Sequence, residues 1–248
     1  AAAATDTKHM QVTRGALKCS DCHSPHASSE AHLLRSGTHE PVATGQCDAC
    51  HKLEGGKPTK DLSDPVPALC ENCHSDKSQL AAKPHAHPPA ADGDCLICHG
   101  AHSGKGGALL TDEQADLCGT CHDNVAQDLK ARVVHPAFAQ GKCGACHDPH
   151  GSDQEKLLKS ADGAMCLSCH ADLGKQLAEG KPNRHPPAAK KDCLRCHFPH
   201  SGDQPHLLRK EQGALCLSCH ADAVKALASK QQHPPFRNGN CTACHSPH

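Results

Sequence analysis

Large aromatic side chains are almost absent from this sequence. Its 248 residues include no tryptophan, no tyrosine and only three phenylalanines. A chain of this length normally buries a core of large apolar side chains, but the mean hydropathy is -0.59, and 18 prolines and 20 glycines interrupt the chain. We therefore expect the polypeptide to remain unfolded unless another apolar component supplies the core.

The sequence also lacks long basic runs and long apolar runs. The formal charge is -1, and the sequence has no long basic run and few aromatic residues that could stack on bases, which argues against a nucleic-acid partner. No apolar run approaches the length of a transmembrane segment.

The first residues, Ala1 to Asp6, resemble what remains after a signal peptidase cuts at small residues. We therefore expect an exported protein, either periplasmic or extracellular at the cell surface.

No cysteine lies outside one repeated motif. All 20 cysteines belong to ten copies of Cys-x-x-Cys-His, which in an exported protein is the attachment signature of c-type haem. The two thiols bond to one haem, and the following histidine ligates its iron. A zinc site uses similar residues, but ten copies without a second kind of cysteine pair favour haem. We expect ten covalently attached haems c, held by Cys19, Cys22, Cys47, Cys50, Cys70, Cys73, Cys95, Cys98, Cys118, Cys121, Cys143, Cys146, Cys166, Cys169, Cys193, Cys196, Cys216, Cys219, Cys241 and Cys244.

The motifs alternate within an internal repeat. A full repeat starts with His-Pro or His-x-Pro, continues with a first motif and, in most repeats, a Leu-Leu pair, and ends with a second motif. The first cysteines of the two motifs are always 23 residues apart, as from Cys47 to Cys70. We predict a rigid two-haem module at 39–86, 87–134, 135–184 and 185–232, flanked by one-haem half-units at 1–38 and 233–248.

The 24 histidines are numerous enough to ligate every iron on both faces. Ten follow a cysteine pair directly and are the expected proximal ligands: His23, His51, His74, His99, His122, His147, His170, His197, His220 and His245. Five lie three residues after a proximal histidine, too close to reach the far face of the same haem, so each should ligate a neighbouring one: His26, His102, His150, His200 and His248. Five more begin repeats: His39, His87, His135, His185 and His233. We predict bis-histidine ligation throughout, and low reduction potentials because no methionine is placed to ligate.

The repeat at 39–86 departs from this pattern. Its His51 is followed by Lys52-Leu53-Glu54, so the third-position histidine is missing. His9 stands at a repeat-start position and is a candidate eleventh ligand, and either His9 or His85 would replace the lost one. His85 also competes with His87, which the spacing favours.

Two histidines precede the Leu-Leu pair, at a position where other repeats have Ala108 and Lys156. Alanine cannot ligate iron, so we interpret His32 and His206 as surface residues.

Secondary structure should be sparse. Helix-forming residues with apolar positions four apart predict short helices at 171–177 and 221–227. The proline after most first motifs predicts a turn at 148–152 and at its equivalents. No sheet is expected beyond incidental pairs.

The order His-Pro, Cys-x-x-Cys-His, x-Pro-His, Leu-Leu, Cys-x-x-Cys-His resembles the doubled-CXXCH family of multihaem cytochromes. The ten-haem count also resembles the periplasmic decahaem cytochromes of the MtrA and DmsE kind and, less specifically, the subunits of extracellular cytochrome filaments. These resemblances imply a multihaem cytochrome c fold of coil, turns and short α-helices with negligible sheet, in an elongated row of stacked haems. They imply redox proteins as donors and acceptors, with an outer-membrane porin or copies of the chain itself as further partners.

Six-coordinate iron has no open position for a substrate, so it exchanges electrons. We therefore expect an electron conduit and no enzyme, with entry and exit at the terminal Cys19 and Cys241 motifs. The alternative is a self-polymerising extracellular filament, in which half-units of two chains join and His9 or His248 ligates iron across the junction. A multihaem reductase is a third alternative. It needs five-coordinate iron, and the abundant histidines and the lack of a Cys-x-x-Cys-Lys motif argue against it.

Overall fold

The computed structural model describes residues 20, 23–28, 33–35, 37–105, 107–178 and 184–248. The predictions for His9, Cys19, Cys22 and His32 lie outside these residues. The chain forms two compact units, each described by itself: residues up to Cys121 with His147–Leu157, and His122–Cys146 with Leu158–His248. The division into repeats predicted from the sequence remains a prediction.

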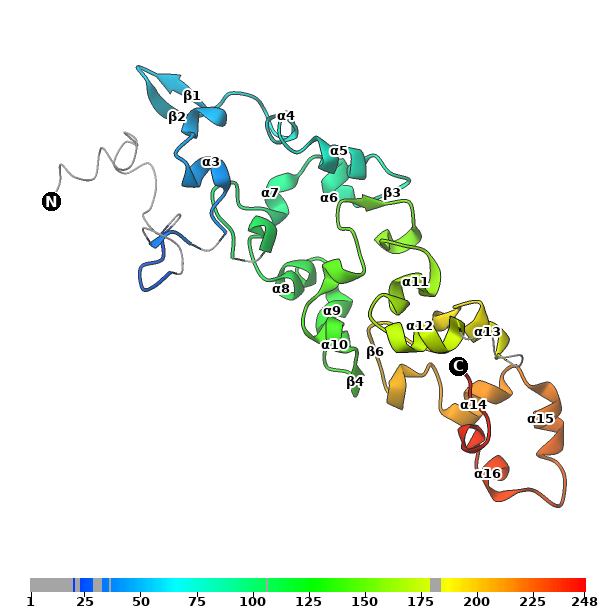
Figure 1. The fold of residues 1–248 in the computed structure, drawn as a ribbon. Coiled ribbons are helices and arrows are strands. Elements are labelled where there is room, and N and C mark those ends of the chain that lie inside the picture. Colours follow the sequence, from blue (N-terminus) through cyan, green and yellow to red (C-terminus); the bar gives the residue numbers. More distant parts are fainter. Residues whose placement is uncertain (1–19, 21–22, 29–32, 36, 106, 179–183) are drawn as a thin grey trace. The chain divides into compact units, whose positions relative to one another are not determined.

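Short helices begin directly after the repeat-start histidines. Proline stands in the first turn of each, where its missing N–H is no loss because the first amides of a helix have no partner within it. The preceding histidine has an extended backbone. These helices, labelled in Figure 1, are α3 (Glu40–Ala43), α6 (Pro88–Ala91), α10 (Pro136–Ala139), α13 (Pro186–Ala189) and α16 (Pro234–Arg237).

Each described second motif lies between two helices. The first helix contains the first cysteine of the motif: α4 (Ala68–Glu71), α8 (Gln114–Gly119), α11 (Asp162–Leu167) and α14 (Gln212–Leu217). The next begins directly after the proximal histidine: α5 (Ser75–Ala81), α9 (Asp123–Asp128), α12 (Ala171–Ala178) and α15 (Ala221–Ala226). Helices α12 and α15 confirm the predictions at 171–177 and 221–227.

Single turns make up the first motifs and the loops that follow them. The motif turns are η2 (Cys47–Ala49), α7 (Cys95–Cys98), η4 (Cys143–Ala145), η6 (Cys193–Arg195) and η8 (Cys241–Ala243). The loop turns are η3 (Gly107–Leu109), η5 (Glu155–Leu157) and η7 (Pro205–Leu207). The turn predicted at 148–152 is present as bends at residues 149 and 150, before a short strand begins.

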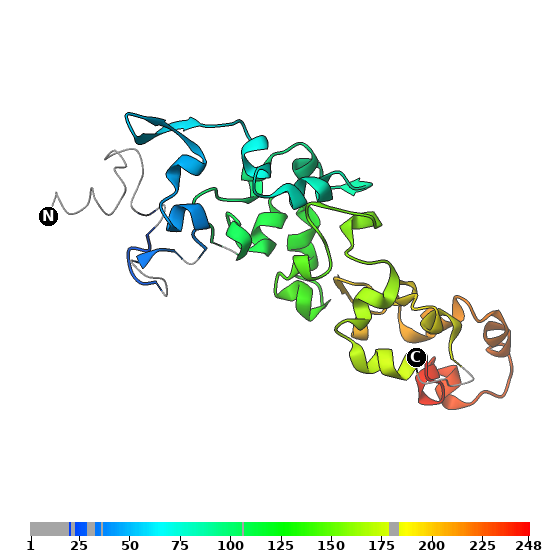
Figure 2. The ribbon, with the colours of Figure 1, turned by 45° about the horizontal axis from the view of Figure 1, so that its top comes forward.

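One hairpin was not anticipated from the sequence. Strands β1 (His51–Glu54) and β2 (Lys57–Leu62) pair antiparallel, with Glu54 opposite Lys57. Gly55 and Gly56 form the turn at φ 59° and 77°, the positive φ that a two-residue hairpin turn requires. Figures 1 and 2 show the hairpin following α3. It occupies the place of the loop that follows the first motif in the other repeats.

Two smaller sheets each pair the last residues of one repeat with a loop of the next repeat but one. Strand β3 (His85–Ala86) pairs with β5 (Gly151–Ser152) in the first unit, and β4 (Val133–Val134) pairs with β6 (Ser201–Gly202) in the second. These are incidental pairs of the kind expected. Each brings the residues before one repeat-start histidine beside the residues after a third-position histidine.

Buried apolar side chains are scarce within the described residues. Leu177 of α12 and Leu207 of η7 are the buried ones there, and no large side chain among them is fully enclosed. The described parts of the chain therefore have no sizeable apolar core of their own, as the composition predicts. None of their helices has the length and apolar character needed to cross a membrane.

Candidate haem sites

Each described first motif presents its thiols from a single turn. In four of these turns the second cysteine donates its amide to the carbonyl of the first, as Cys50 N does to Cys47 O at 3.2 Å and Cys146 N does to Cys143 O at 3.2 Å. Residues three apart in such a turn lie on one side, so both thiols can reach one porphyrin. No cysteine from Cys47 to Cys244 is used in a disulfide.

Successive motifs lie close together. The Cys70 thiol lies beside that of Cys95 in the next repeat, and the equivalent neighbours are Cys166 with Cys193 and Cys216 with Cys241. Burial raises the pKa of the Cys70 thiol, and neighbouring Cys95 raises it further. Groups attached at these cysteines would therefore be neighbours in the order in which their motifs occur.

Histidine rings face one another in pairs at a nearly constant spacing. Six pairs have ring centroids 6.0 to 6.2 Å apart. A metal-to-imidazole bond is about 2 Å long, so two imidazoles on opposite faces of one iron have ring centres roughly 6 Å apart. By contrast, Phe138 and His200 pack directly, with centroids 4.7 Å apart.

The pairs follow two rules. The proximal histidine of a second motif faces the histidine that begins the same repeat, in the pairs His39–His74, His135–His170 and His185–His220. The proximal histidine of a first motif faces the third-position histidine of the next first motif, in the pairs His51–His102, His99–His150 and His197–His248. Third-position histidines thus lie opposite the histidine of a neighbouring motif and not their own.

Backbone hydrogen bonds hold the two kinds of partner together. The amide of His39 donates to His102 O at 2.8 Å, and the amide of His135 donates to His200 O at 2.8 Å. The His39 ring adds a contact from Nδ1 to Ala101 O at 3.0 Å. His39 and His135 are therefore each positioned by the loop that carries the third-position histidine of the following repeat.

Ring orientation differs at one pair. Five pairs have interplanar angles of 8° to 26°, whereas the rings of His135 and His170 cross at 71°. His135 is also the one repeat-start histidine in the described residues whose ring caps its helix, because Ala137 N donates to His135 Nδ1 at 3.3 Å.

The other nitrogen of three first-motif proximal histidines meets a backbone carbonyl. The Nδ1 atoms of His99, His147 and His197 lie 2.8 Å from Ala108 O, Lys156 O and His206 O. In the divergent repeat, His51 Nδ1 is buried without a hydrogen-bond partner.

These features fit haem. Imidazoles paired at this spacing would fill the two axial positions of a haem iron, and the nearby thiols match the attachment chemistry. Within the described residues, no group of three or more histidine, cysteine or acidic side chains is placed to hold a metal ion by itself. The buried Arg184 Nε also has no hydrogen-bond partner, and a haem propionate is the kind of acceptor that satisfies a guanidinium.

A family model described as the doubled CXXCH motif matches residues 9–38, 39–79, 87–127, 135–175 and 185–225. The chain belongs to the doubled CXXCH motif family. A search of curated proteins found no match. The five matched segments and the 20 cysteines make this doubled-CXXCH protein a multihaem c-type cytochrome with covalently bound haem, a class that transfers electrons.

The unassigned histidines of this doubled-CXXCH protein have distinct places. His206 is exposed and takes part through its carbonyl, at the position that Ala108 and Lys156 occupy in other repeats. His85 lies in β3, where the following repeat has Val133 in β4. The carbonyl contacts could not be predicted from the sequence, because the three residues that make them share no side-chain property.

Proposed function

We propose that this protein carries ten haems c, each ligated by two histidines, and conducts electrons along them outside the cytoplasm. The observation that carries the proposal is the recurrence of facing histidine rings 6.0 to 6.2 Å apart at the same repeat positions. Haem iron with both axial positions filled takes up and releases single electrons and offers no site to a substrate. The partners would be redox proteins, with an outer-membrane porin as one candidate.

The polypeptide fixes the order of the haem sites. Second-motif pairs such as His185–His220 join two histidines of the same repeat, whereas first-motif pairs such as His99–His150 join histidines of successive repeats. The thiol contacts, such as Cys166 with Cys193, keep the end of one repeat against the beginning of another. Together these links would hold neighbouring macrocycles close enough for direct electron transfer.

Electron paramagnetic resonance of the purified ferric protein tests this proposal. Bis-histidine ligation predicts low-spin iron throughout, with no high-spin signal in freshly prepared protein. A high-spin component amounting to one or more haems would mean an open iron site, and would favour a multihaem reductase instead.

A filament subunit is the second candidate, and one observation favours it. Among the described residues, no ring faces His26, His233 or His245. The first-motif rule requires a third-position histidine opposite His245, and His26 is such a histidine, so His26 of one copy could face His245 of another. Size-exclusion chromatography and electron microscopy of native protein distinguish the candidates: ordered polymers support the filament, and a monodisperse monomer excludes it.

A further inference from the structure

Three loops that follow first motifs contain the same unusual backbone. Two consecutive residues have left-handed φ: Ala108 and Leu109 at 56° and 60°, Lys156 and Leu157 at 57° and 58°, and His206 and Leu207 at 57° and 57°. None is glycine, although this region is unfavourable for residues with a Cβ. The same strained backbone conformation therefore recurs at the same position in three repeats.

The strained pair directs two carbonyls at the proximal segment. The first carbonyl accepts from the proximal ring, as Ala108 O does from His99 Nδ1 at 2.8 Å. The second accepts from the amide after that histidine, as Leu109 O does from Gly100 N at 2.8 Å. The side chains at the first position are alanine, lysine and histidine, so the backbone oxygen is the functional group.

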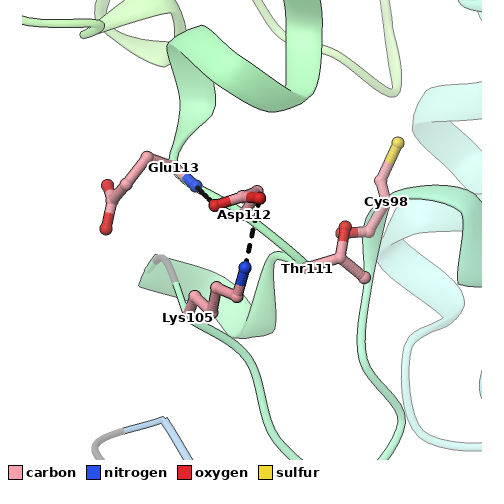
Figure 3. Close-up of polar contacts among 5 residues, drawn as sticks. All are labelled: Cys98, Lys105, Thr111, Asp112 and Glu113. Atoms are coloured by element: carbon pink, nitrogen blue, oxygen red, sulfur yellow. Dashed lines mark hydrogen bonds and ion pairs between the residues drawn. The ribbon is translucent and has the colours of Figure 1, made fainter. Parts of the chain in front are cut away.

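The loop of the 87–134 repeat is held at both sides of this turn. Thr111 N donates to Cys98 O at 2.9 Å, and the Lys105 ammonium lies 3.2 Å from Asp112 Oδ2. Figure 3 shows Thr111 beside Cys98, with Asp112 between Lys105 and Glu113. The loop is thereby fastened to the motif whose histidine it contacts.

A carbonyl at Nδ1 has two consequences for a ligating imidazole. It holds the proton on Nδ1, which leaves Nε2 free to bind iron. It also increases the electron density of the ring, which stabilises ferric over ferrous iron and lowers the reduction potential.

The divergent repeat supplies a natural control. His51 is also a first-motif proximal histidine and has its own facing ring, His102, but the β1–β2 hairpin replaces the strained loop and His51 Nδ1 is buried without a partner. We propose that the left-handed pairs at 108–109, 156–157 and 206–207 position carbonyls that lower the reduction potentials of their haems, and that the haem at Cys47 and Cys50 is the most oxidising of these four first-motif sites. The inference rests on the proposed haem ligation.

A matched pair of substitutions tests the carbonyl. Proline cannot adopt positive φ, whereas glycine adopts it readily, and neither changes the charge at position 108. In a redox titration followed by electron paramagnetic resonance, Ala108→Pro should raise the potential of one low-spin haem, while Ala108→Gly should titrate as the parent protein does. An unchanged Ala108→Pro titration, or equal shifts in both variants, would overturn the proposal.

A second measurement leaves every loop backbone intact, in case the proline variant does not fold. His102→Ala removes the ring facing His51, and His150→Ala removes the ring facing His99, so each deletes one identified haem from the low-spin titration. The component lost in His102→Ala should have the higher potential. An equal or lower potential would contradict the inference but leave the electron-transfer function intact, whereas failure of either variant to lose a low-spin haem would contradict the ligand assignment itself.

Discussion

Proximal histidines of first and second motifs face rings from different parts of the chain. A second-motif histidine such as His74 lies just before a helix and faces His39, which begins its own repeat. A first-motif histidine such as His51 precedes a loop or hairpin and faces His102, from the next repeat. In the first arrangement both histidines belong to one repeat, and in the second they belong to two successive repeats. In a chain with so few buried apolar side chains, these two kinds of histidine pair, rather than a core, would determine its organisation.

The largest expected effect comes from removing one ligand of each kind. His39→Ala and His102→Ala should each convert one haem of ten to the high-spin state, which electron paramagnetic resonance can quantify. Because His102 links two repeats and His39 links parts of one, we expect His102→Ala also to broaden the thermal unfolding transition. His206→Ala is the control and should leave both measurements unchanged, since that side chain is exposed. Low-spin spectra in both ligand variants would refute the two pairing rules.

The second-motif sites differ among themselves in the relative orientation of their two histidine rings. The rings of His135 and His170 cross at 71°, whereas those of His185 and His220 lie at 26°. Crossed imidazole planes leave the iron d orbitals nearly degenerate, which gives a strongly anisotropic low-spin signal. We expect the haem between His135 and His170 to give such a signal in the ferric protein, and we expect its loss in His135→Ala but not in His185→Ala. The absence of this signal from the parent protein would show that the two planes are closer to parallel.

Equivalent glycines test the short sheets that join repeats. A Cβ on Gly151 would lie 2.0 Å from the backbone oxygen of Leu80, whereas a Cβ on Gly202 would meet the movable ring of Phe198 at 3.0 Å. Overpacking typically costs about 1–3 kcal/mol, so Gly151→Ala should destabilise the protein by that amount and Gly202→Ala by less. Chemical denaturation of the haem-loaded variants measures both. Equal losses would indicate that the first sheet adjusts as easily as the second.

The smallest effect is expected at the ion pair of a first-motif loop. The hydrogen bond from Lys105 lowers the pKa of the Asp112 carboxyl, and the Glu113 amide lowers it further. A lowered pKa in the folded state stabilises the fold above the usual carboxyl pKa, and this contribution disappears as the pH falls through the lowered value. Exposed pairs contribute little, so Asp112→Asn should barely change neutral-pH stability but should reduce its acid dependence. Lys175→Ala, on the exposed face of α12, is the matched second-motif control.

The sequence predicted the parts that depend on residue identity. The cysteine pairs fix the attachment sites, and the spacing of His150 after His147 excludes ligation of the same haem from its far face. The helix α12 follows from its apolar spacing. The β1–β2 hairpin was missed, although Gly55-Gly56 is a recognisable two-residue turn signal.

Other features could not be derived from residue types. Which proximal ring faces His150 depends on how one repeat docks on the next, and spacing alone leaves several choices. The carbonyl contact at position 108 depends on backbone conformation, and its equivalents are lysine and histidine. A function carried by a main-chain oxygen leaves little trace in the side chains.

We propose that a row of ten bis-histidine haems, rather than a protein core, organises this polypeptide. Intact-mass spectrometry of the denatured native protein tests it most directly, because thioether-bound haem survives denaturation. We expect a single species that carries ten haems on the 26.0 kDa chain. A homogeneous species with markedly fewer haems, or bare polypeptide that is nevertheless folded, would contradict it.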